Sequence, residues 1–110
     1  MAYDHDLAHR VREQLAEQDR VTEKAMFGGL AFFLSGNMAV GVSGDELMVR
    51  VGAQAADQAL ARPHTRVFDM TGRPMKNWIA VEAPGTRTTR QLSAWVERGI
   101  QFALTLPPKD

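Results

Sequence analysis

The feature that most constrains the fold is a pair of turn signals in the middle of the chain. Residues 35–37 read Ser-Gly-Asn, and Gly44 is followed by Asp45. They separate three short runs, 24–34, 38–42 and 46–51, that are rich in aromatic and β-branched side chains. Strands joined by such short connections pair in antiparallel fashion. The sequence therefore predicts a meander of three antiparallel strands.

Helical signals flank this meander. Apolar residues recur at helical spacing in residues 4–18 and 88–106, and the alanine-rich segment 53–62 ends at Pro63. Asp4 stands at the start of the first helix, and Thr88 with Gln91 three residues later has the form of a capping box. Three helices are predicted, and a short, frayed tail is expected after the last one.

A further strand is predicted at residues 78–81, while Gly72 and Pro74 favour a loop within 67–75. The expected order is α-β-β-β-α-β(-β)-α, an α+β fold in a single domain over residues 1–110, with its core at about 4–106. We expect two layers, an antiparallel sheet of four to five strands covered by the N- and C-terminal helices. The aromatic residues predicted to mark the core are Phe27, Phe32, Trp78, Trp95 and Phe102.

Composition excludes several classes of site. The 110-residue chain has no cysteine, which rules out disulfides, a thiolate nucleophile and cysteine-ligated metal centres. Its formal net charge is zero, so direct binding to nucleic acid is not expected. No apolar run is long enough to span a bilayer, and the N-terminus is acidic where a secretory signal would be basic. A cytoplasmic location without membrane contact is predicted.

Positive charge is concentrated in residues 62–90, which contain six basic residues and two acidic ones. If the fold brings them to one face, they form an anion-attracting patch. The alternative is that they are separate, solvated side chains. The six are Arg62, Arg66, Arg73, Lys76, Arg87 and Arg90.

No motif identifies a catalytic or metal-binding site. His5 and His9 are one helical turn apart, as in a zinc motif, but no third ligand follows, and we expect solvated histidines. No serine lies in a nucleophile elbow. Gly28 and Gly29 lack the spacing of a phosphate loop and are expected to serve a bulge or a close backbone approach. No catalytic residue, metal or cofactor is predicted.

Three motifs carry a resemblance to a known family: Met26, Phe27, Gly28 and Gly29; the run Leu-Met-Val-Arg-Val at 47–51, with Arg50; and Gly72, Arg73, Pro74 and Met75, with Trp78 three residues further on. Their order and spacing resemble the TfoX N-terminal-domain family over residues 4–106. TfoX, also called Sxy, is a bacterial regulator of competence genes. The resemblance implies a small α+β domain, and it brings no catalytic residue with it.

The resemblance also implies a function. TfoX regulators have a second, helical domain and act with the cyclic-AMP receptor protein at promoters, and the present sequence resembles a stand-alone N-terminal domain. We therefore expect a non-enzymatic domain that modulates transcription through contacts with a protein partner. Arg50, Arg73 and Lys76 are the candidate binding residues, because they are the basic members of the motif segments.

The main alternative is a small-ligand sensor or an unrecognised enzyme, with a pocket between the sheet and the helices. Homodimerisation through an exposed strand edge is also left open by the sequence.

Overall fold

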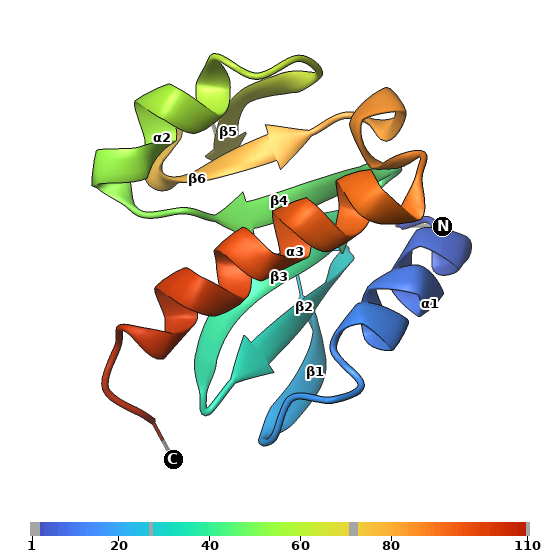
Figure 1. Ribbon diagram of the computed structural model, residues 1–110, viewed down its shortest axis with the longest axis vertical. Helices are drawn as coiled ribbons and strands as arrows, with labels where there is room; N and C mark the ends of the chain where they lie inside the picture. Colours follow the sequence, from blue (N-terminus) through green and yellow to red (C-terminus); the bar gives the residue numbers. More distant parts are fainter. Residues whose placement is uncertain (1–2, 27, 71–72, 110) are drawn as a thin grey trace.

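A computed structural model describes residues 3–26, 28–70 and 73–109 of the chain (Figure 1). The helices are α1 (His5–Gln14), α2 (Ala53–Leu60), the 3-10 turn η1 (Ala83–Thr86) and α3 (Thr89–Leu104). The strands are β1 (Val21–Met26), β2 (Gly29–Leu34), β3 (Asn37–Ser43), β4 (Glu46–Arg50), β5 (Thr65–Met70) and β6 (Arg73–Val81).

The six strands form one antiparallel sheet in the order β1-β2-β3-β4-β6-β5. The α+β class and the meander are confirmed, but the sheet has one strand more than the upper end of the expected range. The run at 24–34, predicted as one strand, belongs to two, because Gly28 has a φ of 75° and turns the chain between β1 and β2. The strands β5 and β6 are the two that the longer form of the expected order allows before the last helix; both extend into the segment 67–75, and residues 71–72 between them lie outside the described residues.

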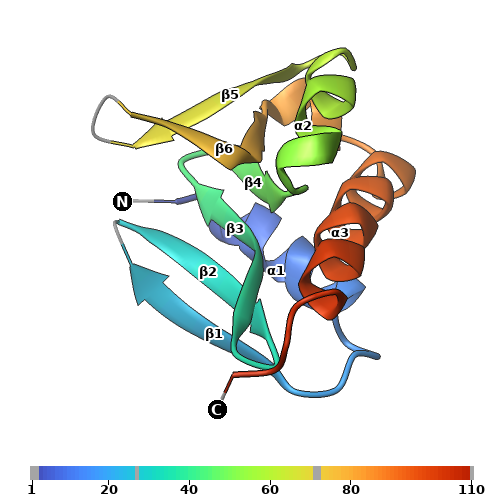
Figure 2. The same cartoon turned by 90° about the vertical axis from the view of Figure 1, so that its left-hand side faces the viewer.

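All the helices lie on one face of the sheet (Figure 2). Paired positions lie on the same face, and the row Phe32, Val40, Val49 and Ile79 is buried beneath the helices. Gly99 lets α3 approach the sheet closely, since a Cβ there would stand 2.6 Å from the backbone oxygen of Ala39. The predicted cover by the two terminal helices is confirmed, and α2 packs beside them against β6.

The helix ends follow the predicted caps. The Asp4 carboxylate accepts hydrogen bonds from the backbone N–H groups of Asp6 and Leu7, at 2.9 and 3.1 Å. In α3, the Thr88 hydroxyl accepts from the N–H of Gln91 at 3.1 Å, and the Gln91 side chain accepts from the N–H of Thr88 at 2.9 Å. These bonds satisfy donors that a helix would otherwise leave without partners.

The C-terminal tail is not frayed up to residue 109, contrary to expectation. The Lys109 N–H donates to the carbonyl of Ser35 at 2.7 Å, and the Asn37 side chain donates to the carbonyl of Pro107 at 2.9 Å. Asn37 is only 3% exposed, so the tail supplies an acceptor to a buried amide. Two prolines follow α3, and hydrogen bonds to the turn between β2 and β3 then fix residues 107–109.

The aromatic predictions are borne out in part. Phe32 and Trp95 are buried, whereas Trp78 and Phe102 are half-buried; Phe27 lies outside the described residues. None of the helices in the described part of the chain has the length and apolar character needed to cross a bilayer.

Candidate functional site

The face of the sheet opposite the helices, here called the open face, carries the predicted residue Arg50. A continuous row of paired positions crosses all six strands on this face. It consists of Lys24, Ala31, Gly41, Met48, Ala80 and Arg66. Three of the four middle positions of the row are glycine or alanine and the fourth is Met48, and cations stand at its two ends.

Methionine side chains on the open face cover the middle of that face. A Cβ on Gly41 would lie 3.0 Å from the Met38 Cε and 3.1 Å from the Met48 Cε, so the two thioether ends stand beside the bare backbone of Gly41. Met48 is 7% exposed and Ala80 is fully buried. Flexible methionines fill irregular space of this kind well.

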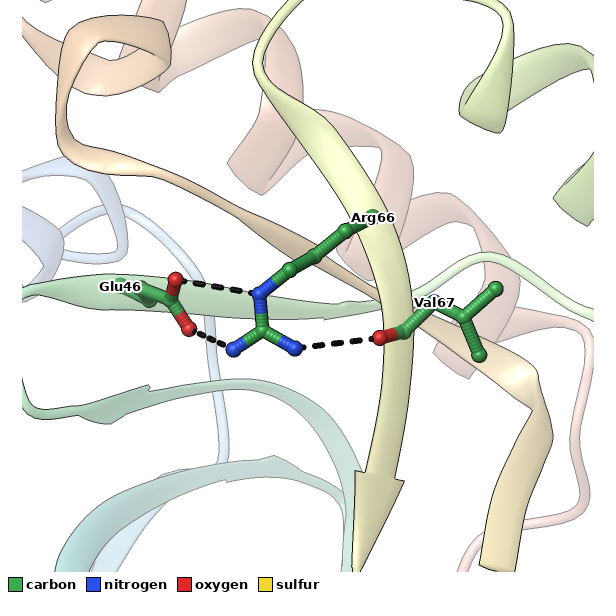
Figure 3. Close-up of polar contacts among 3 residues, drawn as sticks. All are labelled: Glu46, Arg66 and Val67. Atoms are coloured by element: carbon green, nitrogen blue, oxygen red, sulfur yellow. Dashed lines mark hydrogen bonds and ion pairs between the residues drawn. The ribbon is translucent and has the colours of Figure 1, made fainter.

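Arg66 belongs to the segment of positive charge, but its charge is already matched (Figure 3). Its guanidinium forms a two-pronged ion pair with the carboxylate of Glu46 on β4, and Nη1 donates to the carbonyl of Val67 at 3.2 Å. The small side chain of Ala80, between β4 and β5 in the row, leaves room for this crossing. Arg66 therefore contributes little net positive charge to the face.

Arg50 is held between two aromatic rings. Its guanidinium carbon lies 5.9 Å from the centre of the Trp78 ring, at the paired position on β6, and 5.4 Å from that of Phe102 on α3. Both distances are in the range of cation–π attraction. Nη1 donates to the carbonyl of Met38 at 3.3 Å.

The local strand geometry explains this placement. A register shift between Phe32 and Phe33 displaces the start of β3, and the pairing of β3 with β4 ends at Val40 and Val49. The Met38 carbonyl is therefore left without a β4 partner and accepts from Arg50 instead. The Arg50 Nε is buried and has no hydrogen-bond partner among the described residues.

The other two candidate residues stand on β6. Lys76 is exposed, two positions before Trp78, where the register between β5 and β6 shifts. The Trp78 ring also contacts Phe68 on β5, with 6.3 Å between ring centres. Gly72 and the side chains of Arg73 and Pro74 lie outside the described residues. The structure thus brings Arg50 and Trp78 into contact and leaves Lys76 accessible to a partner.

The remaining motif residues have structural positions. Gly28 forms the turn between β1 and β2, and a Cβ on Gly29 would overlap the carbonyl oxygen of Val42, which is the expected close backbone approach. Met26, the last residue of β1, and Met75, the third residue of β6, are half-buried.

The histidines predicted to be solvated are exposed on α1, and the His9 Nε2 lies 3.6 Å from a Glu13 carboxylate oxygen. Within residues 3–26, 28–70 and 73–109, no three histidine or acidic side chains gather as a metal site would require.

Sequence reasoning missed the contact between Arg50 and Phe102, which was assigned to the core only. The signal was Gly52, two residues after Arg50. Gly52 has a φ of 86°, and a Cβ there would stand 2.6 Å from the Phe102 ring. A glycine two residues after the end of β4 thus marks the place where an aromatic side chain of the last helix reaches the strand end.

The fold and the open face define a small α+β domain with helices on one side of its sheet and a mixed basic and aromatic surface on the other. The family model for the TfoX N-terminal domain matches residues 13–103 of the 110-residue chain. The chain belongs to this family. No curated protein matches it.

Proposed function

We propose that this TfoX-type domain is a non-enzymatic regulatory module that modulates transcription by binding a protein partner on its open face. The observation that carries the proposal is the one-sided helix layer: α1, α2 and α3 lie on one face of the sheet (Figure 2), whereas Arg50 and Trp78 are paired positions on the open face, at the strand end that Phe102 of α3 reaches. Lys76 is exposed on β6 nearby. Family membership supports a TfoX-like role, because the family's regulators act at promoters together with another protein.

The chemistry of the surface favours an acidic segment of the partner. Lys24 and Lys76 are exposed cations, and the carboxylate of Glu46 is occupied by Arg66. Half-buried aromatic rings beside basic groups are typical of the residues that dominate protein interfaces. Trp78 is the natural centre of the contact, since it touches both Arg50 and Phe68.

A charge-reversed double variant tests the proposal. Arg73→Glu with Lys76→Glu changes the net charge by the same amount as Arg87→Glu with Arg90→Glu, a matched pair of exposed residues before and within α3. Tagged forms of the wild type and of both variants are used to capture proteins from nuclease-treated native lysate, with mass spectrometry as the readout. Far-ultraviolet circular dichroism confirms that each variant is folded.

We expect the wild type and the Arg87/Arg90 variant to enrich RNA polymerase or a transcription regulator, and the Arg73/Lys76 variant to lose it. Equal enrichment by the two variants, or none by the wild type, would contradict the proposed function.

A further inference from the structure

A second arginine and tryptophan cluster lies on the opposite side of the sheet, among the helices. A hollow of about 350 Å³ opens between α3 and the connection from α2 to β5. We call it the Trp95 hollow, and its principal lining residues are Arg62, His64, Gly85, Gln91, Trp95 and Arg98. Pockets of this size accommodate small molecules.

The connection that forms one wall is fixed by several contacts. His64 has a φ of 66°, and its carbonyl accepts from the Glu82 N–H at 2.8 Å. The Thr65 hydroxyl donates to the carbonyl of Arg62 at 2.8 Å, and a Cβ on Gly85 would come within 3.0 Å of the His64 Cβ. Arg62 and His64 are therefore presented from an ordered backbone, as a built site requires.

The other wall is one face of α3. Gln91, Trp95 and Arg98 are separated by four and three residues, so they share that face. The Gln91 Oε1 is engaged in the helix cap, which directs the Nε2 N–H groups of the same amide elsewhere. Trp95 is only 6% exposed and forms a rigid floor.

Two arginine side chains lie close to the Trp95 ring. The guanidinium carbon of Arg98 lies 5.1 Å from the centre of the Trp95 ring, and that of Arg62 lies 5.9 Å from it. No carboxylate lines the hollow in the part of the chain that the structure describes. Neither guanidinium has a hydrogen bond or ion pair to any described residue. Like charges held close together without a counter-charge attract an anion strongly.

We propose that the Trp95 hollow binds a small molecule carrying a phosphate monoester. Contact with the indole leaves the N–H groups of both guanidinium groups without protein partners among the described residues, and arginine binds phosphate oxygens in two-pronged fashion. Two cations match the charge of a phosphate dianion, and His64 and Gln91 add further donors. The hollow is larger than a phosphate group, so it also has room for the rest of the molecule.

This inference goes beyond the proposed function and does not depend on it, because the two sites lie on opposite sides of the sheet. The phosphate group is the part of the ligand that the two arginines would recognise. A phosphorylated segment of a partner protein would bring the same group, and the experiment separates the two sources.

The test follows the indole N–H resonance of Trp95 and the side-chain N–H resonances of Arg62 and Arg98 by NMR. The full chain is titrated with inorganic phosphate, with phenyl phosphate and with a phosphoserine peptide, each against sodium chloride at equal ionic strength. The variants are Arg98→Gln and Arg98→Lys, and Arg90→Gln is the matched control, since it removes the same charge from α3 outside the hollow.

We expect phenyl phosphate to shift the three resonances and to bind more tightly than inorganic phosphate. Arg98→Gln should weaken binding at least tenfold, Arg98→Lys should retain part of it, and Arg90→Gln should leave it within twofold. Equal weakening by Arg98→Gln and Arg90→Gln, or no shift at Trp95 at millimolar phosphate, would overturn the site. Tighter binding of the phosphoserine peptide would overturn the assignment to a small molecule.

Discussion

Two arginine and tryptophan clusters stand on opposite sides of one sheet and differ in what their guanidinium groups face. Arg50 lies between Trp78 and Phe102, and its Nη1 donates to the Met38 carbonyl. Arg62 and Arg98 lie against Trp95 and line a hollow to which the described residues contribute no carboxylate. The comparison teaches that contact with an aromatic ring does not by itself define the role of an arginine, because the two clusters differ in whether the guanidinium also has a hydrogen-bond partner among the described residues.

The largest effect should come from the glycine that shapes the Arg50 cluster. Gly52→Ala combines a left-handed φ of 86° with a Cβ 2.6 Å from the Phe102 ring. Strain and overpacking together should lower the free energy of unfolding by about 3 kcal/mol, measured by urea denaturation. Phosphate binding at the Trp95 hollow should persist in the folded fraction.

Gly44→Ala is the matched control. Its φ is 57°, but no heavy atom lies within 4 Å of the added Cβ, so only backbone strain of about 1 kcal/mol is expected. Equal losses at the two glycines would show that Phe102 exerts no steric pressure on this strand end.

Arg50 itself should give the next largest effect. Arg50→Ala removes a half-buried side chain from between two rings and leaves the Met38 carbonyl without its donor, which should lower the free energy of unfolding by about 2 kcal/mol. Arg50→Met keeps most of the packing volume and removes the buried Nε that lacks a partner, so it should cost about 1 kcal/mol or less. Chemical denaturation of both variants measures the difference. Equal losses in the two variants would mean that the charge and its hydrogen bond, rather than the packing, hold this cluster.

Much of the fold follows from local signals. The turns at residues 35–37 and at Gly44, the capping box of Thr88 and Gln91, and the stop at Pro63 all act within a few residues, and the elements they predict are present. The extra strand was missed because an apolar run with an internal glycine pair has the same pattern whether it continues or turns back. The φ of Gly28 decides between these outcomes, and the sequence does not display it.

The sites depend on contacts that are distant in sequence and were therefore harder to predict. Arg50 was identified from its motif, but its position between Trp78 and Phe102 depends on strand register and on the approach of α3. In the basic segment, Arg66 pairs with Glu46 on the open face, whereas Arg62 faces Trp95 on the helix side. A charge count along the chain places them together, although strand alternation and the chain reversal after α2 separate them.

The smallest change in stability should come from a substitution in the Trp95 hollow, and this prediction is the most informative one. Arg98→Ala removes no hydrogen bond or ion pair to a described residue, so in phosphate-free buffer the free energy of unfolding should change by no more than about 0.5 kcal/mol. With phenyl phosphate at about 100 times its Kd, the wild type should gain about 2.7 kcal/mol and the variant much less at the same concentration. Thermal denaturation with and without the ligand measures both quantities.

A large loss of stability in Arg98→Ala without ligand would place Arg98 in the same structural role as Arg50, and the contrast between the two clusters would no longer hold. A small loss together with a missing ligand response in the variant would show that the two clusters use the same pair of residue types for different purposes, because Arg98 would then contribute to binding of the phosphate and little to the stability of the chain alone.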